Sequence, residues 1–358
     1  MISRRLTWIA ALLTGCVCTI SAEELETTET TDTSQKATIE LPAWVKNIKF
    51  SGYGMLQYQG QDPEGNHSNT FNLRLARFIL DGKIGDFDWR AQIQGTNVKG
   101  PGEPTVQLVD LYAEWRRFPE FKVRAGQFKR AFTYENPTHP ITQGWRAYAD
   151  VINNLSGFGD RTGEKSSGGR DIGIQFSGDL FPNAKGRRLF HYQVGVYNGE
   201  GINEKDKDNR KDIIGGVWLM PLEGLRLGAF GWKGNRVGVG DKTRYALSAE
   251  YSKNDWTVRS EYIHSKGMGA DATKGDKADG WYAFGIVPVI KSKLHAKARY
   301  QCYRSTKEWS SAKTSYEIGL NYFFTKNLEM HLEYARINDR SLAKHDYNLV
   351  DVELDFRF

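Results

Sequence analysis

Apolar and polar residues alternate along most of this chain in segments of about ten residues. In one such segment every second residue from Phe87 to Ile93 is apolar, and the residues between them are charged or amides. A second segment, 294–301, shows the same alternation. Successive side chains of a β-strand point to opposite faces, so each segment predicts a strand with one apolar and one polar face. About ten residues is also the length that a tilted strand needs to cross a bilayer.

The alternation predicts about 16 strands, which is an even number, as bacterial barrels have. Closing them into a barrel would leave no exposed sheet edge. The fold class that we expect is therefore all-β, a transmembrane antiparallel β-barrel. The predicted strands span residues 48–59, 70–82, 86–95, 105–117, 121–129, 170–179, 188–198, 211–220, 225–233, 242–252, 255–265, 280–289, 294–304, 313–324, 328–337 and 347–358.

The connections between the predicted strands alternate between short and long, as in outer-membrane barrels, where turns are short on the periplasmic side. The short ones are 82–85, 118–120, 221–224, 254, 290–292 and 325–327, and the long ones are 60–69, 96–104, 130–169, 198–210 and 266–279. Loops beyond about 15 residues usually carry a function. We expect the third external loop, 130–169, to fold inward and narrow a pore; an external cap over the barrel mouth is the alternative.

The first 46 residues differ from the rest of the chain. Residues 1–22 resemble a signal peptide, with Arg4 and Arg5 before an apolar stretch and small residues at its end. Cys16 ends a sequence similar to a lipobox, so lipidation at this residue is an alternative. Residues 23–46 are acidic and rich in Thr and predict a flexible periplasmic segment. The barrel would then comprise residues 47–358, in the outer membrane of a Gram-negative cell.

The last predicted strand ends on Phe358, after apolar residues at every second position from Val350. An aromatic residue at the end of an alternating strand resembles the signal that the barrel-assembly machinery of Gram-negative bacteria reads. We therefore expect this machinery as a partner during biogenesis and outer-membrane lipid as the surroundings of the mature barrel.

Composition narrows the function classes. Aromatic residues make up 13% of the chain and the mean hydropathy is −0.57, which fits neither a disordered chain nor a helical membrane protein. The net charge of +6 favours anionic solutes, and export makes nucleic acid an improbable partner. Neither HExxH nor GxSxG occurs, so we expect no enzyme. The run 203–212 has carboxylates at Asp206, Asp208 and Asp212 but lacks the glycine of a calcium loop, and we expect no metal and no cofactor.

Four stretches resemble the phosphate-selective porin O and P family. They are VRAGQFKRAFTYEN (123–136), GRDIGIQFSGDLF (169–181), FHYQVGVYNGEGIN (190–203) and the Asp110-Leu111-Tyr112 strand, and the resemblance extends from about residue 50 to residue 358. It implies a sixteen-stranded barrel, usually a trimer, whose inward third loop and lumen-facing basic residues pass anions.

The alternation also predicts which side chains of each strand point into the lumen, and this strand phase gives the candidate anion contacts. The basic residues expected to line the pore are Arg74, Arg90, Arg116, Arg124, Lys129 and Arg130. Acidic residues such as Glu114 and Glu317 share the inward face, so a general polar pore, or ion pairs that only stabilise the wall, remain alternatives. The predicted function is passive diffusion of small polar, anionic solutes such as phosphate. The alternative is a barrel plugged by its third loop that acts in adhesion or partner docking.

Overall fold

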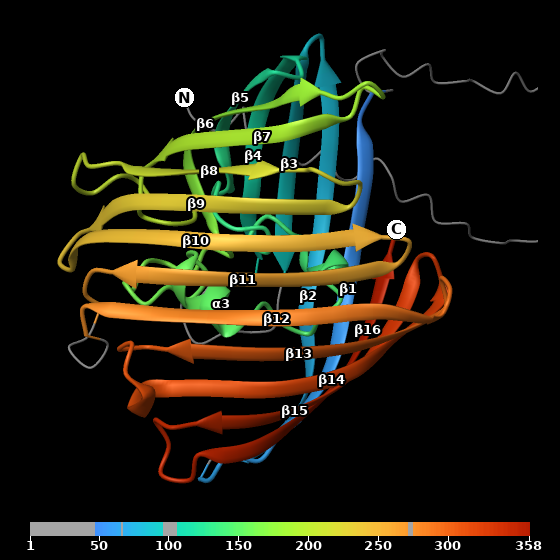
Figure 1. The fold of residues 1–358 in the computed structure, drawn as a ribbon, viewed down its shortest axis with the longest axis vertical. Helices are drawn as coiled ribbons and strands as arrows, with labels where there is room; N and C mark the ends of the chain where they lie inside the picture. Colours follow the sequence, from blue (N-terminus) through green and yellow to red (C-terminus); the bar gives the residue numbers. More distant parts are fainter. Residues whose placement is uncertain (1–46, 66, 96–105, 271–274) are drawn as a thin grey trace, which may run out of the picture. The chain divides into compact units, whose positions relative to one another are not determined.

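The computed structural model describes residues 47–65, 67–95, 106–270 and 275–358, which contain a closed barrel of sixteen strands (Figure 1). The expected fold class is confirmed. The strands are β1 (Lys49–Gln61), β2 (Ser68–Ile84), β3 (Phe87–Gly95), β4 (Val106–Phe118), β5 (Phe121–Lys129), β6 (Arg170–Pro182), β7 (Arg188–Tyr197), β8 (Asp212–Leu219), β9 (Leu225–Arg236), β10 (Gly240–Lys253), β11 (Trp256–Lys266), β12 (Lys277–Ile290), β13 (Leu294–Arg304), β14 (Ala312–Thr325), β15 (Leu328–Asp339) and β16 (Asp346–Arg357).

The predictions for the signal peptide, Cys16, the segment 23–46 and the loop 96–104 lie outside the described residues. Within the part of the chain that is described, no helix is both long and apolar enough to cross a membrane.

Each strand pairs antiparallel with its neighbours in sequence, and β1 pairs with β16 to close the barrel. The outward side chains are mostly apolar and exposed. The inward ones are mostly buried and include polar and charged residues, together with an apolar cluster that packs against the segment 130–169. In β10, for example, Tyr245 and Leu247 are exposed while Arg244 and Glu250 are buried. This distribution follows from the surroundings, because only apolar side chains are stable against lipid tails.

Several β-bulges shift the alternation on the side of the barrel near β1 to β5, and two of them move side chains of the predicted pore lining or lipid face. The register of β1 and β2 shifts between Met55 and Leu56, and Arg74 is the inserted residue of β2. The register of β3 and β4 shifts in the same way, and Val109 is the inserted residue of β4. The alternation predicts Val109 on the lipid-facing side, and this is wrong: the residue is only 1% exposed. A bulge inserts one residue and so reverses the phase of the rest of the strand.

The segment 130–169 contains a short helical turn, η1 (Pro140–Thr142), and a helix, α3 (Asp150–Leu155). The helix contacts β11, β12 and β13, and Figure 1 shows it behind β11 and β12. Phe132 packs edge-on against Trp232 of β9, and Trp145 packs against Phe284 of β12. These contacts place the segment on the inner face of the wall formed by β8 to β14.

Candidate functional site

A cavity of about 110 Å³ lies between the segment 130–169 and the wall formed by β3 to β7. It is lined by Arg90, Asp110, Tyr112, Arg124, Phe128, Lys129, Arg130, Ala131, Pro137, His139, Arg170, Gln175 and Gln193. Five of these side chains are basic and one is acidic. The cavity therefore brings together four of the six predicted anion contacts, Arg90, Arg124, Lys129 and Arg130, although these come from two strands and a loop.

Two arginines of the wall each pair with a carboxylate on a neighbouring strand. Arg90 of β3 donates to Asp81 of β2 at 2.7 Å, and Arg124 of β5 forms an ion pair with Glu114 of β4. The guanidinium of Arg124 also lies 4.6 Å from the centre of the Tyr112 ring. Both arginine side chains keep part of their surface exposed, so a solute in the cavity can contact them.

Lys129 differs because neutral oxygens hold its ammonium group. Its Nζ donates to the carbonyl oxygens of Asn136 at 2.5 Å and Thr138 at 3.1 Å, and to the Tyr148 hydroxyl at 3.1 Å. Among the described residues no carboxylate forms an ion pair with it. Lys129 is partly buried, and its ammonium group adds to the cavity a positive charge with which no described carboxylate pairs.

Arg77 of β2 is a second cation held by neutral oxygens. It is buried, and the alternation did not predict it. It donates to the Gln94 side-chain oxygen at 2.9 and 2.6 Å and to the Tyr53 hydroxyl at 2.7 Å. No carboxylate of the described residues pairs with it. Arg77 points inward together with Arg74, three residues earlier, because of the bulge at Arg74.

Arg130 and Arg170, at the two ends of the long loop, are both neutralised. Arg130 is 1% exposed and donates to Glu164 at 2.6 Å and to Asp171 at 2.8 Å. Arg170, which the strand phase also missed, donates to both carboxylate oxygens of Asp110 at 2.8 and 3.0 Å. Arg130 therefore secures the base of the loop. Its buried, fully paired guanidinium offers no free surface to an anion.

The two remaining predicted residues lie away from this cavity. Arg74 pairs with Glu353 of β16 at 2.6 Å. Arg116 is 55% exposed near the short turn after β4 and pairs with Asp88 at 2.5 Å. An exposed ion pair of this kind exerts a weak, salt-screened field. Neither residue joins the cluster at the cavity.

His139 of the loop faces the cavity and is neutral. Its Nε2 lies 3.2 Å from the guanidinium of Arg90, which can only donate, so Nε2 accepts. Burial, reinforced by the cations Lys129, Arg77, Arg170 and Arg90, lowers the pKa of His139 to about 3. Histidine therefore contributes a hydrogen-bond acceptor to the cavity and no charge.

We expect His139 to contribute no change in ion selectivity between about pH 5 and 8, because it binds no proton in that range. A histidine with an ordinary pKa would gain a positive charge as the pH falls through about 6.5 and would increase the preference for anions. Reversal potentials measured across this pH range check the expectation, with His139→Asn as the control. A step near pH 6.5 that His139→Asn abolishes would contradict it.

The opposite side of the loop is attached to the far wall by charged side chains. Glu261 accepts hydrogen bonds from the backbone N–H groups of Tyr134 at 2.7 Å and Glu135 at 2.8 Å. Arg244 pairs with Asp160 at 2.6 and 2.7 Å, with both side chains fully buried. Inward charges of β10 and β11 thus hold the loop against the far wall, with the cavity on its other side, toward β3 to β7.

Two protein families match the chain, each over nearly half of it. Residues 50–210 match the phosphate-selective porin O and P family, and residues 182–342 match the Gram-negative porin family. The first match agrees with the resemblance found in the sequence. No curated protein matches the chain.

Solved structures of outer-membrane channels share the fold at low sequence identity. An anion-selective porin from Comamonas acidovorans is 14% identical with a TM-score of 0.64, over 87% of this chain and 99% of that chain. OmpF of Salmonella typhi, in a complex with daunomycin, is 12% identical with a TM-score of 0.65, over 87% and 98%. The outer-membrane channel DcaP of Acinetobacter baumannii is 11% identical with a TM-score of 0.61, over 87% and 97%.

Proposed function

We propose that this chain is a porin of the Gram-negative outer membrane that passes small anions, phosphate among them, by passive diffusion. Its barrel fold and both family matches support this proposal. The observation that carries the proposal is the excess of positive charge at the cavity between the loop and β3 to β7. Two cations in this region, the partly buried Lys129 and the buried Arg77, have no carboxylate partner among the described residues.

The chemistry of the cavity suits an anion that loses part of its hydration shell. Partly exposed guanidinium groups of Arg90 and Arg124 can donate charge-assisted hydrogen bonds, and the ammonium of Lys129 adds a point charge. The carboxylates paired with the two arginines weaken each contact. A channel needs this balance, since an ion must bind well enough to enter and weakly enough to leave.

In this proposal the protein is a passive channel and not an enzyme, and the solute moves down its own gradient. We further propose a homotrimer embedded in outer-membrane lipid, inserted by the barrel-assembly machinery after export through the signal peptide. The trimer follows from the family resemblance, and the size of the detergent-purified protein tests it.

We expect the purified barrel to give anion-selective conductance steps in a planar bilayer. The measurement is the reversal potential in a KCl gradient, repeated with millimolar phosphate, which should reduce the chloride current by competing for the same cations. Steps with weak selectivity would instead indicate a general polar pore. Absence of any step would indicate a barrel plugged by its third loop, and the proposal would then be wrong.

A further inference from the structure

Three buried side chains near the periplasmic end of the lumen bring metal-binding atoms together. Glu329 and His331 lie on β15, which begins after a short turn, and Asp355 lies on β16 directly opposite Glu329. Short turns are periplasmic in outer-membrane barrels. One nitrogen or oxygen atom from each side chain lies within 4.8 Å of the other two. Because the three residues come from two strands, no short sequence motif marks this cluster, and none of them lines the cavity at Lys129.

The spacing of the three atoms resembles that in a zinc site. His331 Nε2 lies 3.1 Å from Glu329 Oε1 and 3.4 Å from Asp355 Oδ2. Neighbouring ligands of a tetrahedral zinc ion, with bonds of about 2.0–2.2 Å, lie about 3.3–3.6 Å apart. Imidazole and carboxylate groups both bind zinc, and three protein ligands leave a further position for water or a solute. The two distances from Nε2 therefore already suit a bound zinc ion.

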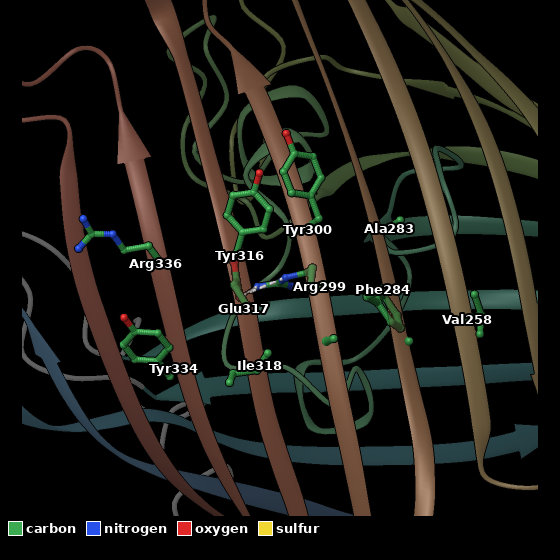
Figure 2. Close-up of a pocket in the computed structure, with 12 residues that line it drawn as sticks. Val258, Ala283, Phe284, Arg299, Tyr300, Tyr316, Glu317, Ile318, Tyr334 and Arg336 are labelled. Carbon is green, nitrogen blue, oxygen red and sulfur yellow. Dashed lines mark hydrogen bonds and ion pairs between the residues drawn. The ribbon is translucent and has the colours of Figure 1, made fainter.

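Asp355 has a buried carboxylate that is not fully satisfied by the protein. Its side chain is 1% exposed, and Oδ1 has no hydrogen-bond partner among the described residues. In that part of the chain Asp355 also pairs with no Lys or Arg. Such a carboxylate is costly to bury, and a cation bound to it would offset the cost. Three neighbouring inward carboxylates each have a basic partner; they are Glu317 with Arg299 (Figure 2), Glu333 with Lys297 and Glu353 with Arg74.

His331 can offer Nε2 to a metal ion without losing a strong contact. Nε2 carries at most one hydrogen, which cannot point at both carboxylates, whereas a metal ion on Nε2 contacts both. Across the ring, Nδ1 lies 3.4 Å from the ammonium of Lys297, which Glu333 holds more closely at 2.5 Å. Arg357, which pairs with Glu329 at 2.9 Å, is 28% exposed and can turn toward solvent. The contacts that a metal ion would replace are therefore weak or exposed.

We propose that Glu329, His331 and Asp355 bind a zinc ion on the inner wall of the barrel. Calcium is the less suitable ion, because it takes six to eight oxygen ligands and has little affinity for imidazole. Bound zinc adds positive charge near the periplasmic end of the lumen. The proposal does not rest on anion selectivity, because zinc binding is measured without any current.

Equilibrium dialysis against zinc chloride tests the site on the full barrel, purified without a histidine tag and treated with a chelator. We expect the wild type to bind one zinc ion per barrel at micromolar free zinc. His331→Gln removes the imidazole and should weaken this binding at least about tenfold. The matched control is His191→Gln, at an inward histidine that pairs with a single carboxylate, Asp179 at 2.7 Å, and it should bind zinc as the wild type does.

Asp355→Asn is the second variant, and it should weaken zinc binding to a similar extent. Heat-dependent mobility on gels verifies that every variant is a folded barrel. Millimolar calcium should leave the bound zinc in place, and its displacement by calcium would contradict a histidine ligand. Equal zinc binding by the wild type and His331→Gln would overturn the proposal, because His331 would then only bridge the two carboxylates as a protonated imidazole.

Discussion

Replacing Lys129 with Gln is expected to lower the permeability ratio of chloride over potassium about tenfold. Glutamine keeps an amide that can donate to the Asn136 and Thr138 carbonyl oxygens, so the loop keeps its place while the charge is lost. At an effective dielectric constant of about 20, a unit charge acts on an ion 4 Å away with about 4 kcal/mol, and a tenfold change needs about 1.4 kcal/mol. Reversal potentials in a KCl gradient measure the ratio.

Arg116→Gln is the matched control for this experiment. It removes one positive charge as well, but from a side chain that is 55% exposed and already paired with Asp88. Its effect on the permeability ratio should stay within about twofold, because water and salt screen an exposed charge. Equal effects of the two substitutions would mean that the overall charge of the lumen, and not the cavity at Lys129, sets selectivity.

Asp160→Asn is expected to detach the loop from the far wall and leave the barrel folded. The substitution leaves the guanidinium of Arg244 buried without its carboxylate, and the loss of one partner of a buried pair costs about 3–5 kcal/mol. The strand pairing is untouched, so the cost falls on the contact between loop and wall. We expect larger and noisier conductance steps, and trypsin cleavage at basic residues within 130–169.

Lys165→Gln provides the control in the same loop. Lys165 pairs with Glu204 at 2.9 Å, but both side chains are partly exposed, and such pairs contribute at most about 1 kcal/mol. This variant should conduct and resist trypsin as the wild type does. If Asp160→Asn also behaves as the wild type, the loop is held by its aromatic and backbone contacts and the ion pair is dispensable.

The alternation of apolar and polar residues predicts the strands closely because a membrane barrel imposes one rule at every position. β5 and β13 have the predicted bounds, 121–129 and 294–304, and the other strands differ at their ends by a few residues. A side chain faces either lipid or the lumen, and the period of two records this choice. The alternation fails where a bulge adds a residue, as at Val109 and at Arg74.

The cavity was harder to predict, because it depends on partners far apart in the sequence. Strand phase places Arg124 and Lys129 near the lumen, but it cannot tell that Arg130 turns to Glu164 and Asp171. The alternation did not predict Arg77, because counting every second residue from Arg74 puts the Arg77 side chain on the lipid-facing side. Only an observed register can reveal a bulge at that position, since no Gly or Pro marks it in the sequence.

Attachment of the loop to the far wall also has a kinetic consequence. The backbone of Tyr134 is bound by Glu261, 127 residues later, and that of Arg146 by Glu333, 187 residues later. Closing contacts over such separations is slow, because the entropy of the intervening chain is lost before the contact forms. The cavity between the loop and β3 to β7 is therefore completed late in folding, after the strands that hold the loop.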